Sequence, residues 1–297
     1  MNIMELLKKY GTQEHCIELL EHVRWGNDSV CAYCGSKRVY RQSEKNRQPR
    51  WKCNACHKSY SVTVGTIFHG THLELSYWFA VLSLMLNAKK SLSSYQVSRD
   101  IGIRQGTVLK VQNRIREAMS GKQGRLLKGI VEMDETYIGG RPRKSNMRKN
   151  NRPAKRGRGA DKLPVVGVVE RGGDVVAKVV KGARLGTETL ESVVKATVDT
   201  AESHLVTDDY KGYSSMAAIL PHSVANHSVA YSFNGIHTNN IEGFWSLLKR
   251  AWYGQHHHYS KANARLYVAE ASYKYNNRKN ENSFSDMIET MLFARGN

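Results

Sequence analysis

The chain has 297 residues, and its 45 Lys and Arg against 26 Asp and Glu give a formal charge of +19. A chain of this length can bury a substantial core and hold more than one module. Such a charge concentrates phosphate around a protein and favours a polyanionic partner, although ribosomal and membrane-surface proteins can carry the same charge. No run comes near the roughly 20 apolar residues of a membrane span, and the first residues lack a signal peptide's long apolar core. We therefore expect a cytoplasmic protein without a disulfide scaffold.

The first predicted element is a helix from about Thr12 to Val23, inside an N-terminal helical segment over residues 1–27. Cys16 lies on this helix and is interpreted as a small buried hydrophobic residue.

The other four cysteines form two CxxC knuckles that are separated by 18 residues. This spacing is typical of a four-thiolate zinc site and predicts a zinc ribbon over residues 28–66. Its single structural Zn²⁺ would be bound by Cys31, Cys34, Cys53 and Cys56. Two reducible disulfides or a redox pair are the alternative.

Basic residues surround the hairpin of the predicted ribbon, which indicates contact with DNA, although a zinc ribbon can equally dock a protein. These residues are Lys37, Arg38, Arg41, Lys45, Arg47, Arg50 and Lys52.

A helical block is predicted over residues 67–124. The segment LELSYWFAVLSLMLNAKK is apolar on nearly every face and predicts a buried helix. The next segment predicts a helix, a short turn at Gly102 and a second helix from about Arg104, which is helix-turn-helix geometry. The second helix would offer Gln105, Lys110 and Arg114 to a major groove. A packed helical hairpin between two domains is the plain alternative.

The remainder, residues 125–297, alternates short strands and helices. VEMDETYIGG predicts a strand of limited length with Asp134 near its end, and PVVGVVERGGDVVAKVV predicts a hairpin that turns at Gly172-Gly173. The expected elements that follow are a helix in TETLESVVKATVDT, a strand in HLVTDD, a short helix in SMAAIL, a strand in SVANHSV and a helix from Asn240 to Tyr253. This order favours an α/β, ribonuclease-H-like sheet.

Asp208 follows the HLVT strand on the face of Val206 and His204. The helix NNIEGFWSLLKR has an apolar stripe, and Glu242 and Lys249 share the neighbouring face. Since seven residues make nearly two turns, Lys249 would stand below Glu242 and could hold a DNA phosphate. In a ribonuclease-H-like sheet, three carboxylates that share one point would bind two magnesium ions and cut or join phosphodiesters.

Each acid also has a plain interpretation. Asp134 and Asp208 could be ordinary acids where strands give way to loops. Glu242 lies three residues after Asn239 and could be the back-bonding glutamate of a capping box.

The segment 141–158 contains nine Lys or Arg, two prolines and no acid. It cannot bury apolar area, so we expect a flexible cationic arm just after the Asp134 strand. Backbone contacts with DNA are favoured over a loop without a role, and the expected contact residues are Arg143, Lys144, Arg148, Lys149, Arg156 and Arg158.

The run His256 to His258 could suggest a metal site. Adjacent side chains point in different directions, so three of them do not easily bind one ion. Tyr253 and His258 are interpreted instead as residues of a DNA-binding or active-site wall.

The motifs DETYIGG, TDDYKGY and HTNNIEGFWSLLKR, with Gly254 and the histidine run, resemble the catalytic segments of bacterial insertion-sequence transposases. The chain is most similar to the group numbered fifteen-ninety-five, whose members join this domain to an N-terminal zinc ribbon. The resemblance implies that Asp134, Asp208 and Glu242 form the DDE triad with Lys249 as its basic companion. It also implies DNA contact at Arg250 and two Mg²⁺ or Mn²⁺ per active site. Some relatives carry Asn as the third ligand, so Asn239 and Asn240 remain alternatives to Glu242.

The expected function is that of a DNA transposase that cleaves transposon ends and joins their 3′-hydroxyls to target DNA. Its partner would be double-stranded DNA, bound by a homodimer or larger synaptic assembly associated with the bacterial nucleoid. One alternative is a zinc-ribbon and helix-turn-helix regulator without catalysis. Another is a ribonuclease-H-like nuclease or resolvase that cannot join ends.

Overall fold

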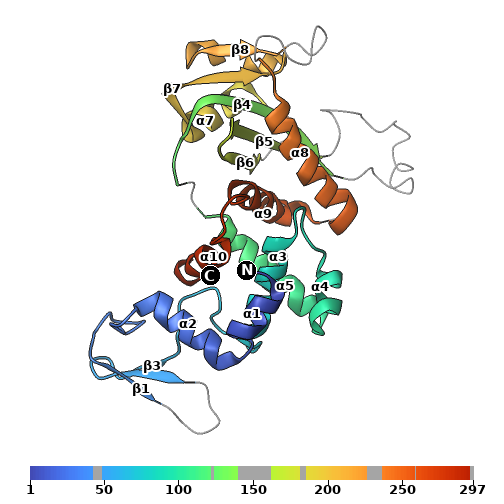
Figure 1. Cartoon of the computed structure of the whole chain (residues 1–297). Coiled ribbons are helices and arrows are strands. Elements are labelled where there is room, and N and C mark those ends of the chain that lie inside the picture. Colours follow the sequence, from blue (N-terminus) through green and yellow to red (C-terminus); the bar gives the residue numbers. More distant parts are fainter. Residues whose placement is uncertain are drawn as a thin grey trace, which may run out of the picture. The chain divides into compact units, whose positions relative to one another are not determined.

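The computed structural model describes residues 1–42, 49–121, 124–139, 162–180, 185–225, 236–257 and 259–294. The chain folds as two compact units: Met1–Gly121 together with Lys279–Asn297, and Lys122–Arg278 (Figure 1). Among the described residues, no helix combines the length and apolar character needed to cross a bilayer.

Two short helices open the first unit, α1 (Ile3–Tyr10) and α2 (Gln13–Trp25). The side chain of Asn2 accepts a hydrogen bond from the Glu5 backbone and so caps α1, and Thr12 caps α2 in the same way. Cys16 on α2 is fully buried, as predicted, and burial raises the pKa of its thiol to about 12.

The zinc-ribbon segment forms an antiparallel sheet of β1 (Val39–Gln42), β2 (Arg50–Cys53) and β3 (Ser59–Tyr60), in that order. Aromatic rings of this segment pack on α2: the Trp25 ring lies 5.4 Å from that of Trp51 and 6.1 Å from that of Tyr60. The three strands are too short to bury much apolar surface, so this fold depends on another source of stability.

The helical block consists of α3 (Leu75–Asn87), α4 (Ser94–Ile101) and α5 (Gln105–Met119). Most of α3 is buried, as its uniformly apolar sequence predicts. Gly102 ends α4 with a φ of 71°, a left-handed conformation that glycine adopts without strain. The predicted helix, short turn and second helix are confirmed.

The last helix, α10 (Ser283–Phe293), belongs to the first unit, whereas the sequence suggested a catalytic domain that runs to residue 297. Its amphipathic face is buried among the N-terminal helices, where the Phe284 ring lies 5.8 Å from Phe79 and 6.5 Å from Tyr10. This apolar face needs a partner surface, and the aromatic residues of α1 and α3 provide it. The second unit therefore ends at Arg278.

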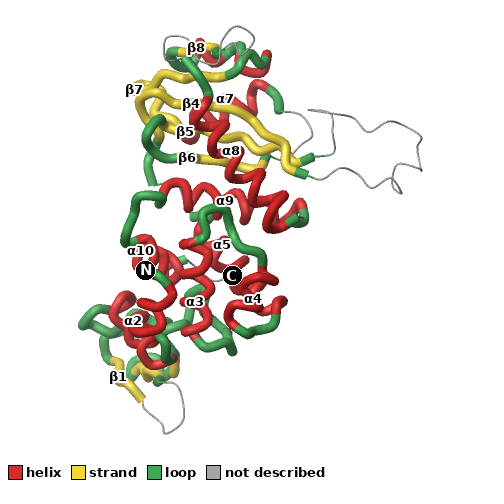
Figure 2. Tube along the Cα trace, turned by 45° about the vertical axis from the view of Figure 1, so that its right-hand side comes forward, coloured by secondary structure: helices red, strands yellow, loops and turns green. Residues whose placement is uncertain are grey.

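The second unit is built on a five-stranded sheet in the order β6-β5-β4-β7-β8 (Figure 2). The strands β4, β5 and β6 pair antiparallel, whereas β7 is parallel to β4 and β8 is parallel to β7. This mixed α/β sheet is consistent with the ribonuclease-H-like fold that the order of elements predicted. The strands are β4 (Leu127–Ile138), β5 (Leu163–Glu170), β6 (Val175–Val179), β7 (Val198–Thr207) and β8 (His222–Val224).

The central strand β4 is longer than its sequence suggested, since it has 12 residues and continues past Asp134 to Ile138. The extension is held by β5, where Tyr137 pairs with Pro164 and Ile138 with Leu163. β7 also begins earlier than expected, at Val198, so the TVDT sequence is mostly strand rather than helix. The SMAAIL segment forms only a 3₁₀ turn, Met216–Ala218.

Helices cover both faces of this sheet. On one face α7 (Thr187–Thr197) packs on Met133 and Val168. On the other face lie α8 (Asn239–Ala251) and α9 (Ala264–Asn276) (Figure 1). Their apolar side chains pack on a group of buried strand residues that includes Val165. Because successive strand residues alternate between faces, Asp134 lies on the α8 face and Met133 on the α7 face.

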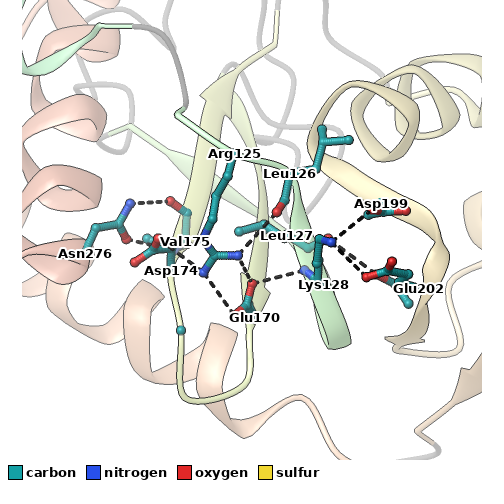
Figure 3. Close-up of polar contacts among 12 residues, drawn as sticks. Arg125, Leu126, Leu127, Lys128, Glu170, Asp174, Val175, Asp199, Glu202 and Asn276 are labelled. Carbon is teal, nitrogen blue, oxygen red and sulfur yellow. Dashed lines mark hydrogen bonds and ion pairs between the residues drawn. The ribbon is translucent and has the colours of Figure 1, made fainter.

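The start of β4 is held by polar contacts with its neighbours (Figure 3). Glu170 accepts bonds from Arg125 Nη1 at 2.6 Å, from Arg125 Nη2 at 3.0 Å and from the Lys128 backbone at 3.0 Å. Lys128 Nζ reaches Glu202 at 2.8 Å. These bonds connect β4 with the end of β5 and with β7.

Gly167 on β5 allows α8 to lie close to the sheet. A Cβ atom at this position would lie 2.6 Å from Cη2 of Trp245 and 3.0 Å from Cδ1 of Ile241. Gly167 pairs with Asp134, so the close approach occurs directly beside that acid.

We predict that Gly167→Ala destabilises the second unit by about 1–3 kcal/mol, because the added methyl overpacks the space occupied by Trp245. Thermal unfolding with tryptophan fluorescence measures this loss. Gly243→Ala is the matched control: a Cβ there meets nothing within 4 Å, so alanine in α8 should stabilise by about 0.5–1 kcal/mol. Equal behaviour of the two variants would contradict the packing argument.

Candidate active site and zinc centre

The two aspartates are brought together by the register of the parallel pair β4 and β7. Ile130 pairs with His204 and Glu132 with Val206, so continuing the register places Asp208 beside Asp134. Asp208 is the first residue after β7, and its Oδ1 accepts a bond of 3.1 Å from the Tyr210 backbone as the chain turns. Both carboxylates are half-buried.

Asp134 is surrounded by both hydrogen-bond donors and negative charge. Its Oδ2 accepts the indole N–H of Trp245 at 2.9 Å, and its Oδ1 accepts the Glu135 backbone N–H at 2.7 Å. Burial, followed by the negative charges of Glu135 and Asp208, raises the pKa of Asp134 to about 7. Each Asp134 oxygen still has a lone pair available to a cation, because a carboxylate oxygen can accept two bonds.

Glu242 is exposed in the first turn of α8. Thr238, not Asn239, is the N-cap residue, and its hydroxyl donates to Glu242 Oε1 at 3.1 Å. The plain alternative for Glu242, a capping box with Asn239 as the N-cap residue, is therefore not what the structure shows. Trp245, one turn later, bonds Asp134, so the helix that carries Glu242 is fixed on the strand that carries Asp134. Lys249 and Arg250 are exposed in the last turn.

The three acids do not form a preassembled metal-binding group. In the part of the chain that the structure describes, the four cysteines are the only group of three or more such residues placed to hold an ion. The structure therefore places Asp134 next to Asp208 by strand register and Glu242 on the helix packed above them, without drawing all three together.

The start of α8 is held by a residue that the sequence analysis did not select. Glu132, two residues before Asp134 on β4, is fully buried and accepts bonds from the backbones of Asn240 at 2.8 Å and Ile241 at 3.1 Å. Arg171 Nε also donates to it at 2.7 Å. A charged residue in the strand VEMDE was the only available signal, and its backbone partners in α8 come more than 100 positions later.

The cysteine group has the geometry of a zinc site. Sγ of Cys31 lies 3.6 Å from that of Cys56, Sγ of Cys34 lies 3.7 Å from that of Cys53, and all four atoms lie within 4.8 Å of one another. Tetrahedral zinc with bonds of about 2.3 Å places its sulfurs about 3.8 Å apart. These distances are too long for disulfide bonds, and all four cysteines are free thiols in the structure.

Backbone N–H groups further prepare the knuckles for thiolates. Cys53 Sγ accepts from Ala55 at 3.3 Å and from Cys56 at 3.5 Å, and Cys31 Sγ accepts from Tyr33 at 3.4 Å. The Cys56 N–H, and then that of Ala55, lower the pKa of Cys53 to about 6. The thiolate is the form that binds zinc.

The expected DNA-reading residues of α5 have different environments. Lys110 is exposed. Gln105 donates to Ser94 Oγ at 2.7 Å, and Arg114, although exposed, donates to the carbonyls of Ile67 at 3.1 Å and His69 at 3.2 Å. Gln105 and Arg114 therefore have structural partners within the first unit.

Two further expectations fall partly or wholly outside the described residues. The basic segment 141–158 and His258 lie outside the described residues. This segment contains the expected DNA contacts Arg143, Lys144, Arg148, Lys149, Arg156 and Arg158. His256 is described and packs 4.6 Å from the Tyr267 ring, while Tyr253 is 64% exposed.

Comparison with known proteins agrees with this architecture. Residues 126–276 match the family described as ISXO2-like transposase domain, and residues 11–59 match the family described as transposase zinc-ribbon domain. The chain belongs to this transposase family, the insertion-sequence group fifteen-ninety-five, in which a zinc ribbon precedes a DDE domain.

A relative from Halobacterium salinarum (strain ATCC 700922 / JCM 11081 / NRC-1) is described as an uncharacterized protein in transposable element ISH50. It is 26% identical over 265 residues, which cover 86% of this chain and 88% of the relative. A chain in the cryo-EM structure of the simian T-cell lymphotropic virus intasome in complex with PP2A regulatory subunit B56 gamma matches 66% of this chain and 65% of its own. Its 14% identity and TM-score of 0.28 carry no argument about this protein.

We predict that Cys53→Ser abolishes zinc binding and unfolds the β1–β3 ribbon, because a sheet this small depends on the metal for its stability. Zinc content by atomic emission and amide exchange of residues 50–60 measure both effects. Cys16→Ser, at the cysteine outside the group, should retain the zinc. Zinc retained by Cys53→Ser would exclude this ligand set.

We predict that Asp134→Asn stabilises the metal-free second unit at alkaline pH. The folded pKa of Asp134, about 7, exceeds its ordinary value of 3.8, so folding favours the protonated acid. This contribution is complete below about pH 4 and is lost as the pH rises through 7. The variant should therefore gain about 1–3 kcal/mol over the native protein at pH 8 and less at pH 5.

Thermal unfolding between pH 5 and pH 8, without added magnesium, measures this difference. Asp209→Asn removes a neighbouring exposed acid and should leave the profile unchanged. A gain for Asp134→Asn that does not depend on pH would refute the charge explanation.

Proposed function

We propose that this transposase cleaves the ends of its element and joins the free 3′-hydroxyls to target DNA, with Asp134, Asp208 and Glu242 as the metal-binding triad. The observation that carries the proposal is the alignment of Asp134 with Asp208 on neighbouring parallel strands. The membership of the chain in a transposase family and the position of Glu242 on the helix above Asp134 support it.

The donor set fits hard divalent cations, since Mg²⁺ prefers carboxylate oxygens. Burial, and then the negative charges of Glu135 and Asp208, raise the pKa of Asp134, and a bound cation would offset the cost of ionising it. When bound, two Mg²⁺ or Mn²⁺ ions would supply Lewis-acid activation of the attacking oxygen and stabilise charge on the leaving oxygen. The Trp245 N–H orients the Asp134 carboxylate for this role.

The basic residues near α8 would bind the DNA substrate. Lys249 and Arg250 are exposed on the helix that carries Glu242, and they would hold phosphates next to the reacting bond. The formal charge of +19 favours double-stranded DNA as the partner, and Lys110 on α5 is an exposed cation of the helix-turn-helix. Two transposon ends must be joined together, so we infer a homodimer or larger synaptic assembly.

We predict that Asp134→Asn, Asp208→Asn and Glu242→Gln each reduce strand transfer by at least about 10³-fold while leaving DNA binding intact, because each removes a metal-binding charge. The assay combines the protein, Mg²⁺, labelled terminal DNA and a supercoiled plasmid. Asp209→Asn, next to Asp208 but exposed, serves as the control and should retain activity.

The same assay separates the proposal from its alternatives. Joined products support the transposase, nicking without joining indicates a nuclease or resolvase, and binding without either indicates a regulator. Undiminished cleavage by Asp134→Asn in Mg²⁺ would refute the triad.

A further inference from the structure

Glu132 occupies a position that ordinary folding does not explain. Its carboxylate is 0% exposed in the central strand β4, on the same face as Asp134. Burying a carboxylate costs free energy, and an apolar residue of similar size often gives equal or greater stability. We propose that Glu132 is a positioning residue that fixes the first turn of α8 and thereby sets Glu242 relative to Asp134 and Asp208. This inference rests on the proposed function.

The contacts of Glu132 are those of a helix cap supplied from another element. Its Oε2 accepts the backbone N–H groups of Asn240 at 2.8 Å and of Ile241 at 3.1 Å. These N–H groups lie in the first turn of α8, where donors have no partner inside the helix. Its Oε1 accepts the Asn240 side chain at 2.8 Å. An acid is also favoured at a helix N-terminus by the helix dipole.

The N-cap residue of the helix supplies no such bond. Thr238 is its N-cap residue, but its side chain accepts no bond from the first turn and instead donates to Glu242. The preceding segment supplies one bond of 3.4 Å, from the Asn239 N–H to His237 Nδ1, whereas the next two N–H groups bond Glu132 on β4.

Arg171 and His237 complete the arrangement. Arg171 Nε donates to Glu132 at 2.7 Å, and Arg171 Nη2 donates to the His237 carbonyl at 2.8 Å. The ring of His237 lies 3.3 Å from the same carboxylate. Since the Arg171 backbone N–H bonds the Ile130 carbonyl at 3.0 Å, this arginine connects β4, the turn after β5 and the segment before α8.

Two residues of β4 bond α8 on either side of Glu242, and we call these bonds the two anchors of the helix. Glu132 holds residues 240 and 241, and Asp134 holds Trp245 through its indole N–H. Two anchors on the same face of β4 define both the start and the rotation of the helix. Loss of the first would leave the helix joined to the sheet at Trp245, yet allow its first turn to shift. A shift of about 1 Å in such a constellation can cost about 100-fold in rate.

A matched pair of variants tests this role. In Glu132→Met/Arg171→Met the buried ion pair is replaced by apolar side chains, so the unit should remain folded. Glu132→Gln/Arg171→Met lacks the same guanidinium but keeps one oxygen that can face the helix N–H groups. We expect the methionine pair to lower kcat of strand transfer by about 100-fold with unchanged KM for DNA, and the glutamine variant to recover most of that loss.

Amide exchange gives a readout that does not depend on activity. The N–H groups of Asn240 and Ile241 should be protected in the native protein and in the glutamine variant, and should exchange faster in the methionine pair. The control is Glu170→Met/Arg125→Met, because Glu170 also accepts an arginine and a backbone N–H, but that N–H belongs to Lys128 at the start of β4 and not to α8 (Figure 3). It should retain kcat.

The outcomes are distinct. Native kcat in the methionine pair, or loss of kcat in the Glu170 control to the same degree, would overturn the positioning role. Unprotected amides at residues 240 and 241 in the native protein would overturn it without any variant, even if the variants failed to fold. A native protein without strand transfer but with the expected exchange pattern would instead refute the proposed function and leave the helix anchor standing.

Discussion

Two carboxylates that share a half-buried site must be protonated, separated or neutralised, and this electrostatic constraint governs the centre of the second unit. The register of the parallel strands β4 and β7, continued by two residues, places Asp208 beside Asp134. Burial is the main cause that raises the pKa of Asp134 to about 7, and the negative charges of Glu135 and Asp208 add to it. A buried acid of this kind destabilises the fold when it is ionised, and a bound divalent cation would displace its proton.

The strand β4 organises most of this chemistry because its two faces have separate tasks. The face of Met133 packs into the apolar core under α7. The opposite face carries Glu132 and Asp134, which bond the two ends of the same stretch of α8. Gly167 on the neighbouring strand leaves the space that brings Trp245 within reach of Asp134. Fold and site are thus determined by the same short segment of backbone.

Local patterns in the sequence were sufficient where structure depends on near neighbours. The two CxxC knuckles predicted a cysteine group whose sulfurs lie within 4.8 Å, and Gly102 predicted the turn between α4 and α5. The order of strands and helices, with the family resemblance, predicted the mixed sheet. The apolar stripe of α8, which is buried, was also predicted correctly, because apolar residues recur in its sequence with the helical period of 3.6 residues.

Contacts between distant segments could not be predicted in this way. Glu132 is an isolated acid in an apolar strand, and its role depends on backbone donors of α8. Arginine is a residue type that often contacts bases in the DNA major groove, yet Arg114 donates hydrogen bonds to two carbonyls of the loop before α3. The extension of β4 to Ile138 depends on pairing with β5, which outweighs the turn signal of the following glycines.

The return of α10 to the first unit makes the second unit an insertion, joined to the rest of the protein by two peptide connections rather than one. The helix α10 also covers part of the N-terminal core, because the ring of Phe284 packs against the rings of Tyr10 and Phe79. Shortening the chain at its C-terminus would thus first damage the N-terminal unit, far away in sequence from the cut.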